Sequence, residues 1–318
     1  MIRIATVGTS TITRNFLDAA ASVDEVAVTT VYSRDPRRAA KFAADTGVPH
    51  WTDDLDGLLA DAEIDAVYLA SPNGAHAEQA RRVVDAGKHV LVEKPAVPTV
   101  AEFDTLLEVA AARKVVVLEA MRNVHDPALR HVAALIATVG PVRRASLSYC
   151  QRSARYDKVL AGEHVNIFDP ALAGGALLDL GVYTIAAMVE FFGEPNRVTG
   201  SSVPIASGVD GAGAVLAAYD DFVVDLSYSK ITASDRPDEI QGEHGTLTFD
   251  HVAQPTVAQV RMHDGTVTDH TFGGPSNNMV HEIRRFADLV GGDADPASDQ
   301  RCTRATLRVV EEIQRHQI

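Results

Sequence analysis

The first 120 residues alternate short strand patterns with amphipathic helix patterns, and this alternation restricts the possible folds more than any other feature. Apolar or β-branched runs occupy residues 2–7, 25–32, 66–70, 89–92 and 115–120, and helix patterns occupy residues 13–21, 36–46, 75–86 and 100–113. Strands that are separated by helices of this length require crossover connections, which are right-handed and produce a parallel sheet. We therefore predict an α/β fold with an N-terminal parallel sheet of the Rossmann type over residues 1–120.

The pattern changes after Met121, where hairpin-like segments replace the strand–helix repeat. We expect helices at 127–137, 176–192, 278–290 and 299–316, strands at 142–150, 197–203, 212–218, 222–229, 246–249, 256–262 and 266–272, a loop at 151–173, and a turn at 239–242. Hairpins with turn signals such as Asp264-Gly265 favour antiparallel pairing. Residues 121–318 are therefore predicted to form an α+β domain with an open, mostly antiparallel sheet and helices on one face.

The charge and cysteine content narrow the possible partners and the compartment. The formal net charge of −14 argues against nucleic acid, because such binding needs Lys and Arg to neutralise phosphates. The only cysteines, Cys150 and Cys302, have no disulfide or zinc-site spacing, as is usual in a reducing cytoplasm. The chain enters a strand directly at Ile2, and no apolar run approaches about 18 residues. We expect a cytoplasmic protein that does not bind a membrane or nucleic acid.

The turn after the first strand is the candidate cofactor site. It comprises the residues Gly8, Thr9, Ser10, Thr11, Ile12 and Thr13. A Rossmann fingerprint has three glycines here, and this turn has one, with Ser10 and Thr13 at the other two positions. The turn nevertheless follows a buried strand and opens a helix, where free N–H groups and hydroxyls bind phosphate oxygens. An ordinary capped strand-to-helix turn is the alternative.

The end of the second strand bears on the choice between NADP and NAD. An acid at this position holds the ribose 2′-hydroxyl in NAD enzymes. The chain has Ser33 and Arg34, followed by Arg38 and Lys41, which favour the 2′-phosphate of NADP. Asp35 is the residue that favours NAD. We predict NADP as the preferred cofactor and NAD as the alternative.

Further polar residues follow two other strands of the predicted sheet. Lys94 lies beyond the strand at 89–92, between Glu93 and Pro95. The preceding strand is followed by a polar set that consists of Ser71, Pro72, Asn73 and His76. The carboxyl ends of parallel strands meet at one edge of the sheet, where ligands bind. We therefore expect this set and Lys94 to lie near the turn at Gly8 and to contact the cofactor.

Four motifs together give a resemblance to a known family. They are the N-terminal turn that begins at Gly8, then Ser71-Pro72-Asn73-Gly74-Ala75-His76, then Glu93-Lys94-Pro95, and the later run from Gly174 to Tyr183, which reads GGALLDLGVY. In this order, over essentially the whole chain, they resemble the Gfo/Idh/MocA family of NAD(P)-dependent oxidoreductases. The resemblance implies a Rossmann domain, a C-terminal α/β domain, and oxidation of sugars, inositols or related alcohols or the reverse reduction. It also implies a homodimer or homotetramer formed through the C-terminal sheet.

The resemblance implies roles for the residues in these motifs. Lys94 is the leading catalytic candidate, since an ammonium stabilises negative charge on a substrate oxygen, and Glu93 is placed to orient it. Asp179 and Tyr183 are spaced i, i+4 and share a helix face. Many family members have His at the second position. The tyrosine resembles the branch of glucose–fructose oxidoreductase and dimeric dihydrodiol dehydrogenase, and a tyrosine beside a lysine can relay a proton.

The substrate is predicted to be a small polyol, sugar or related carbonyl compound. Its pocket is expected to use Arg122, His125, Tyr156 and Asn166, with His164 as a further candidate. No histidine set has metal-ligand spacing, so no metal is expected. Two alternatives remain at this point. The chain could be a regulatory protein that senses NAD(P) without chemistry, or a glycosidase that oxidises its substrate transiently with a tightly held NAD.

Overall fold

A computed structural model describes residues 1–316 of the chain. Two compact units are present, and neither is continuous in sequence. The first contains Met1–Ala120 and Pro275–Arg301, and the second contains Met121–Gly274 and the chain from Cys302 onward. The chain passes from the first unit to the second at residue 121, which is the predicted domain boundary. Residues 275–301, which were predicted to belong to the second domain, pack with the first unit.

The first unit contains a six-stranded parallel sheet with the order β3-β2-β1-β4-β5-β6. This is the strand order of a dinucleotide-binding Rossmann sheet. Its strands are β1 (Ile2–Val7), β2 (Val26–Tyr32), β3 (His50–Thr52), β4 (Ala66–Leu69), β5 (His89–Glu93) and β6 (Val117–Ala120). Its helices are α1 (Thr11–Ala20), α2 (Pro36–Thr46), α3 (Leu55–Ala60), η1 (Asn73–Ala75), α4 (His76–Asp85), α5 (Val100–Arg113) and α10 (Met279–Gly291).

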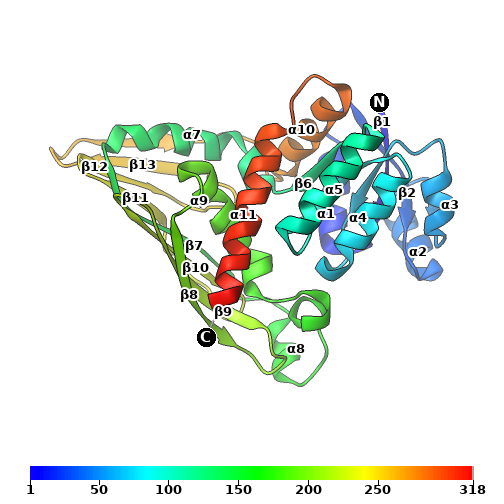
Figure 1. Cartoon of the computed structure of the whole chain (residues 1–318), viewed down its shortest axis with the longest axis horizontal. Helices are drawn as coiled ribbons and strands as arrows, with labels where there is room; N and C mark the ends of the chain where they lie inside the picture. The colour runs from blue at the N-terminus through cyan, green and yellow to red at the C-terminus, as the bar shows by residue number, and fades with distance from the viewer. Residues whose placement is uncertain (317–318) are drawn as a thin grey trace. The chain divides into compact units, whose positions relative to one another are not determined.

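Helices cover both faces of this sheet. In Figure 1, α4 and α5 lie side by side in front of the sheet and α1 lies behind it. The face under α1 is also covered by α10, whose Ile283 and Phe286 are fully buried against β-strand residues such as Ile4 and Tyr68. Because β4, β5 and β6 are covered on both sides, they are almost continuously apolar, as buried parallel strands are.

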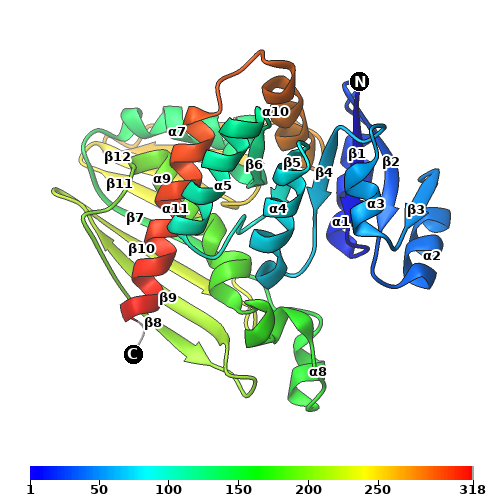
Figure 2. The same cartoon turned by 45° about the vertical axis from the view of Figure 1, so that its right-hand side comes forward.

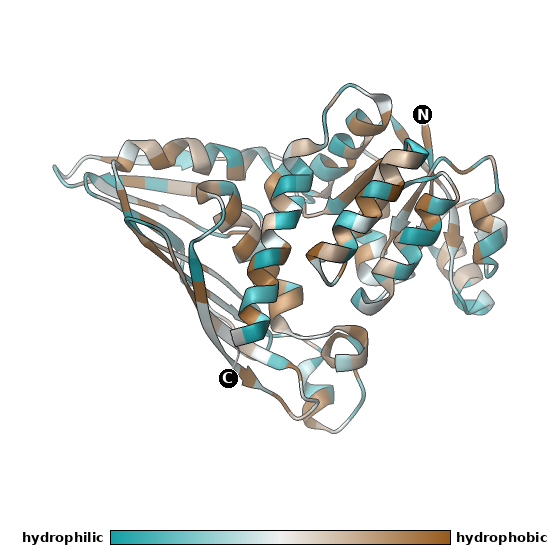
Figure 3. Ribbon diagram, viewed as in Figure 1, coloured by the Kyte–Doolittle hydropathy of each residue, from teal (hydrophilic) through white to brown (hydrophobic). Residues whose placement is uncertain are grey.

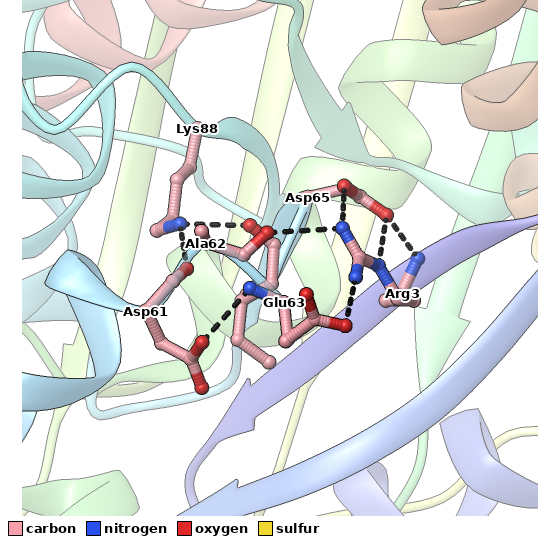
Figure 4. Close-up of polar contacts among 7 residues, drawn as sticks. Arg3, Asp61, Ala62, Glu63, Asp65 and Lys88 are labelled. Carbon is pink, nitrogen blue, oxygen red and sulfur yellow. Dashed lines mark hydrogen bonds and ion pairs between the residues drawn. The ribbon is translucent and has the colours of Figure 1, made fainter.

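A polar network ties β1 to the segment before β4. The side chain of Asp65 accepts hydrogen bonds from the backbone N–H of Arg3 at 2.8 Å and from its guanidinium at 2.8 and 2.9 Å. Lys88 is buried and donates to the carbonyls of Asp61 and Ile64, both at 2.7 Å (Figure 4). Hydrogen bonding to Arg3 lowers the pKa of Asp65 to about 2. These bonds fix the amino-terminal edge of the sheet, opposite the edge where the predicted cofactor residues lie.

The second unit contains an eight-stranded sheet with the order β14-β13-β12-β11-β7-β10-β9-β8. Its strands are β7 (Val142–Cys150), β8 (Arg197–Pro204), β9 (Asp210–Ala218), β10 (Val223–Ser229), β11 (Asp238–Gly242), β12 (Gly245–Phe249), β13 (Val257–Met262) and β14 (Val267–Thr271). Its helices are α6 (Arg122–His125), α7 (Pro127–Ile136), η2 (Ala137–Val139), α8 (Tyr156–Leu160), η3 (Asn166–Phe168), η4 (Pro170–Leu172), η5 (Leu177–Gly181) and α9 (Val182–Phe192). A last helix, α11 (Ala297–His316), has its first residues in the first unit and the remainder in the second.

Only the pair β7 and β10 is parallel in this sheet, and every other neighbouring pair is antiparallel. The helices α7, α9 and α11 lie over one face, as Figure 2 shows. Among the described residues, no helix covers the other face. The predicted fold class is therefore confirmed. In Figure 3, α11 alternates teal and brown along its length, as expected for a helix with one buried side.

The structure corrects the prediction of a turn at 239–242. These residues belong to β11, which pairs with β7 and with β12 in the middle of the sheet. The segment has little strand signal because Asp238, Glu239 and Gln241 are polar, yet Ile240 is fully buried in the core. The elements β3 and α3 were also not predicted, and α8 was predicted as part of a loop. All three are six residues long or shorter, and two of the three β3 residues are exposed.

The stretch Pro170–Phe192 is long and apolar enough, by length and composition, to cross a membrane. It did not stand out in the sequence, because polar residues and glycines interrupt its apolar run. In the structure 67% of its most apolar window is buried inside the protein. Val182, Ile185 and Met188 are completely inaccessible within the core of the second unit. A central core helix passes the same test of composition, and burial accounts for the apolar character here.

The buried carboxyl group of Asp238 joins β7 to the turn after β12. Asp238 is 1% exposed, and its Oδ1 accepts the N–H of Ser148 at 2.6 Å. It also accepts a hydrogen bond from the backbone of Val252. Burial raises the pKa of Asp238 to about 7, although both backbone donors favour the carboxylate.

This raised pKa predicts how the stability of the protein depends on pH. The folded state binds the Asp238 proton more tightly than the unfolded state does. Its contribution to the free energy of unfolding is therefore complete below the ordinary pKa of 3.8 and is lost as the pH rises through about 7. Asp238→Asn carries no titrating group, so its Tm should rise relative to the wild type by at least about 2 °C between pH 5 and pH 8. The exposed Asp221→Asn is the control, and a constant Tm difference for Asp238→Asn across this range would contradict the prediction.

Candidate functional site

The turn after β1 brings two strand ends into close backbone contact. Gly8 has φ +120°, a conformation that side chains rarely adopt, and its N–H donates to the carbonyl of Tyr32 at 3.2 Å. A Cβ atom at Gly8 would lie 2.5 Å from the carbonyl oxygen of Ala70, at the end of β4. Only glycine fits this position without a shift of the backbone. The single glycine of the turn therefore stands where the packing of the sheet requires one.

The amino terminus of α1 has the properties of an anion site. Ser10 is the N-cap residue with extended backbone, and its side chain makes no capping hydrogen bond. The first turn of the helix contains no acidic residue. Thr11 is exposed and Thr9 and Ile12 are half-buried, while the buried hydroxyl of Ser71 has no hydrogen-bond partner among the described residues. Helix N–H groups that no cap satisfies bind phosphate groups, so these residues fit the pyrophosphate of a dinucleotide.

The structure assigns Asp35 a local role at the end of β2. Its Oδ1 caps α2 by accepting the N–H of Arg37 at 2.9 Å and that of Arg38 at 3.3 Å. The N–H of Asp35 in turn donates to the hydroxyl of Ser33 at 3.3 Å. The side chains of Arg34 and Arg38 are exposed, and neither forms an ion pair within the described chain.

Contacts with Glu93, His76 and Glu119 fix the turn that carries Lys94. Glu93 is 8% exposed, and its carboxylate accepts the hydroxyl of Tyr68 at 2.6 Å and the N–H of Lys94 at 3.3 Å. The carbonyl of Pro95 contacts Nδ1 of His76 at 2.9 Å. The N–H of Ala96 donates to the buried carboxylate of Glu119 at 2.9 Å. Lys94 is half-buried in a turn whose backbone is held on both sides.

His76 has no exposed surface, which makes it a support for this turn. Its Nε2 contacts the carbonyl of Ser71 at 2.9 Å, so the ring connects the ends of β4 and β5. Burial lowers the pKa of His76, and the charge of Lys94 acts in the same direction. A neutral ring donates to one of the two carbonyls. Pro72 and Asn73 lie beside Ser71 and are half-buried.

The second unit gathers aromatic and basic side chains around Tyr183. Arg122 donates from Nε to the Tyr183 hydroxyl at 3.3 Å, and its guanidinium carbon lies 5.4 Å from the centre of that ring. The ring of Tyr149 lies 5.6 Å from that of Tyr183 and 4.7 Å from that of His251, in an edge-on arrangement. The Nδ1 of His251 accepts the N–H of Ala253 at 3.0 Å. Burial lowers the pKa of His251, which favours a neutral ring with its proton on Nε2.

The backbone of Tyr183 is held as firmly as its side chain. Asn123 is completely buried and donates from Nδ2 to the carbonyls of Tyr183 at 3.1 Å and Val252 at 3.3 Å. The preceding turn, η5, is a π-helix, an irregularity that is frequent at functional sites. Tyr183 is 5% exposed, and Arg122, which was predicted as a substrate residue, lies against it.

Asp179 forms an ion pair that was not predicted from the sequence. Its carboxylate contacts the ammonium of Lys230, which follows β10. The Lys230 Nζ also lies 5.8 Å from the centre of the Phe168 ring. No motif marked Lys230, because it is distant in sequence from the helix of Asp179 and lies at the end of a strand.

The other predicted substrate residues differ in their exposure and in their contacts. His125 is 5% exposed within α6, whereas Asn166 is exposed at the start of η3. Tyr156 packs its ring 5.9 Å from that of Phe168. His164 is exposed and contacts Asp169 through Nε2 at 2.7 Å. Tyr156 is therefore connected to the Lys230 pair through Phe168.

Comparison with family models decides the classification of the chain. The model described as an oxidoreductase family with an NAD-binding Rossmann fold matches residues 2–121, and that of the GFO/IDH/MocA C-terminal domain matches residues 129–248. The chain belongs to the Gfo/Idh/MocA oxidoreductase family. The predicted resemblance is confirmed, and the first unit is the nicotinamide-dinucleotide-binding domain of an oxidoreductase.

Individual relatives agree with this classification. The chain is 38% identical over 317 residues to scyllo-inositol 2-dehydrogenase (NADP(+)) IolU of Bacillus subtilis, covering 99% of this chain and 97% of that protein. It is 29% identical to D-xylose 1-dehydrogenase (NADP(+)) 2 of Haloferax volcanii, covering 89% and 87%. Among solved structures, the 3-ketoreductase KijD10 from Actinomadura kijaniata, in complex with NADP and TDP-benzene, matches with a TM-score of 0.90 and 25% identity, covering 99% of this chain and 98% of that one.

The geometry at Gly8 predicts the effect of its replacement. Gly8→Ala introduces a Cβ atom 2.5 Å from the carbonyl of Ala70 at a φ of +120°, so the turn must shift away from β4. We expect the Kd for NADP to rise at least about tenfold in calorimetric titrations, since a displaced turn misaligns the helix N–H groups. Gly47→Ala is the matched control, because Gly47 also has positive φ but its added Cβ would have no neighbour within 4 Å. Unchanged NADP affinity in Gly8→Ala would contradict the assignment of this turn.

Proposed function

We propose that the protein is an NADP-preferring dehydrogenase or reductase that acts on a hydroxyl or carbonyl carbon of a cyclitol or sugar. The observation that carries the proposal is the turn of Lys94. A lysine at the carboxyl end of β5 is held by Glu93, His76 and Glu119, and β4 alone separates its strand from the strand that ends at Gly8. The names of IolU and KijD10 support NADP and this substrate class.

A bound NADP(H) would supply or accept the hydride, and the turn at Gly8 and the end of β2 would hold it. The chain supplies the groups that act on the substrate oxygen. The Lys94 ammonium stabilises the negative charge that develops there, and its rigid backbone keeps the ammonium oriented without reorganisation. Glu93 is a positioning residue, because its carboxylate is engaged by Tyr68 and by the Lys94 N–H.

We assign the proton transfer to Tyr183. Its hydroxyl accepts a hydrogen bond from Nε of Arg122 at 3.3 Å, which orients the phenol oxygen. Asn123 and Tyr149 hold its backbone and ring in one orientation. The Tyr183 hydroxyl therefore exchanges the proton of the substrate oxygen as general acid or base.

The preference for NADP rests on the end of β2. Oδ1 of Asp35 caps α2 by accepting two N–H groups, which argues against a role for this acid in selecting the ribose 2′-hydroxyl of NAD. The exposed guanidinium of Arg34 and the Ser33 hydroxyl supply donors for a 2′-phosphate. Arg38 adds a positive charge on the first turn of the same helix.

We also propose a homodimer or homotetramer that forms through the open face of the eight-stranded sheet. Leu216 is 47% exposed and Val257 is 46% exposed, in strands β9 and β13. Apolar side chains on an uncovered sheet face favour association. Light scattering of the purified protein measures the oligomeric state.

We place the protein in the cytoplasm, in keeping with Cys150 and Cys302, which form no disulfide in the described chain.

A substrate panel tests the proposed activity. The protein is incubated with NADP⁺ or NADPH and with scyllo-inositol, myo-inositol, D-xylose, D-glucose or their keto derivatives, and the absorbance of the reduced nicotinamide is followed. Turnover of at least one polyol or ketone with NADP(H) is expected. Tight NADP binding without any turnover would support a sensor instead, and product formation without net absorbance change would support a glycosidase.

Lys94→Met tests the catalytic assignment. Methionine retains much of the length of the side chain and removes the charge, so we expect kcat to fall at least about a hundredfold. The Kd for NADP should change much less, because the helix N–H groups and the end of β2 are intact. The exposed Lys114→Met, in the same unit, is the control. A Lys94→Met enzyme with wild-type kcat would exclude the proposed role.

Arg34→Ala tests the cofactor preference. Loss of a charge-assisted hydrogen bond to the 2′-phosphate should raise the KM for NADP at least about tenfold. The KM for NAD should stay within about twofold. Arg81→Ala, which removes an exposed arginine paired with Asp85, is the control. The same relative change for both cofactors would argue against recognition of the 2′-phosphate by Arg34.

A further inference from the structure

Lys230 is a charged residue in the interior of the second unit. Its side chain is 6% exposed, and its backbone N–H donates to the carbonyl of Gly211 at 2.8 Å. Transfer of an ammonium group from water to such an environment is strongly unfavourable unless a partner compensates. The proposed chemistry assigns no role to this residue, although it contacts Asp179 within the motif that ends at Tyr183.

The contacts of Lys230 compensate for its burial and connect three segments. The ammonium pairs with the Asp179 carboxylate on η5 and lies 5.8 Å from the centre of the Phe168 ring on η3. The Phe168 ring is 1% exposed and packs against Tyr156 of α8. Lys230 therefore joins the end of β10 to the helix of Tyr183 and to the segment that contains the predicted substrate residue Tyr156.

A second carboxylate fixes the start of the same helix. Asp210 accepts the N–H of Leu177 at 2.7 Å. A Cβ atom at Gly175, where φ is +128°, would overlap the Asp210 carboxylate. The helix turn that carries Asp179 is thus held at its first residue by Asp210 and at its third by Lys230.

The ion pair is asymmetric in its exposure. The Asp179 side chain is 25% exposed, against 6% for Lys230. The carboxylate of Asp179 is paired with the Lys230 ammonium, and a carboxylate is an acceptor of hydrogen bonds only. The pair therefore presents an oriented anionic acceptor four residues before Tyr183. Hydroxyl groups of a polyol are the complementary donors.

We propose that Lys230 is a positioning residue that fixes Asp179 as the acceptor for a non-reacting hydroxyl of the substrate. This inference rests on the proposed oxidoreductase function and adds to it. Substrate recognition then depends on a hydroxyl besides the one that is oxidised. The hydrogen bond between Asp179 and this second hydroxyl is the same before and during hydride transfer. Its loss should therefore raise KM and leave kcat nearly unchanged.

The test compares single variants with a variant that removes both charges. Lys230→Met leaves the half-buried carboxylate of Asp179 without its ammonium and should lower the Tm. Asp179→Leu/Lys230→Met replaces the pair with apolar side chains, a change that buried ion pairs often tolerate. We expect the double variant to keep the Tm within a few degrees of the wild type. Its KM for the best polyol of the panel should rise at least about tenfold, with kcat within about threefold. The exposed Lys158→Met is the control and should leave both constants unchanged.

A folded double variant with wild-type KM would overturn the proposal, because the pair would then serve only the fold. A decrease in kcat with unchanged KM would also overturn it. Hydrogen exchange of residues 166–181 measures the positioning without a substrate, and both Lys230 variants should accelerate it at least about tenfold. Unchanged exchange in this segment would rule out the positioning role. Lack of turnover by the wild type on every panel compound would instead count against the proposed function, so the two failures are distinguishable.

Discussion

The close approach of Gly8 to the carbonyl of Ala70 is the constraint on which the cofactor domain depends. It allows β1 and β4 to end side by side. The amino terminus of α1 follows β1 after a short turn. Parallel pairing then places the end of β5 next to β4, and His76 connects these two ends through the carbonyls of Ser71 and Pro95. A side chain at residue 8 would separate the two strand ends. The positions of α1 and Ser71 therefore depend on this backbone contact, and His76 extends its effect to the turn of Lys94.

Both units use buried or half-buried carboxylates to hold irregular backbone near the predicted site residues. Glu93 and Glu119 accept N–H groups of the turn that carries Lys94. Asp210 and Asp238 do the same for the start of η5 and for the turn after β12. Such groups are costly to bury, and hydrogen bonds from the backbone reduce that cost. An acidic chain is thus compatible with ordered turns, because several of its acids act as internal acceptors.

The sequence predicted what depends on local periodicity and on motifs. The helix at Val100–Arg113 and the strand at Val142–Cys150 were placed to the residue, and Lys94, Asp179 and Tyr183 were predicted as site residues from their motifs. The sequence did not reveal Lys230, Asn123 or His251, because each meets its partners only through tertiary packing. The strand β11 was missed for a related reason. Its polar residues carry little strand propensity, and its place in the sheet comes from pairing on both sides.

The position of α10 in the sequence affects when the two units can fold during synthesis. This helix supplies apolar side chains, among them Met279, Ile283 and Phe286, to the core beneath β1 and β4, yet it follows the whole sheet of the second unit in sequence. During synthesis from the amino terminus, one face of the Rossmann sheet lacks this cover until nearly nine-tenths of the chain has left the ribosome. The nascent cofactor domain is an unfinished body for most of translation. The second unit also needs the residues from Cys302 onward. A product that is truncated before α10 therefore contains neither unit in complete form.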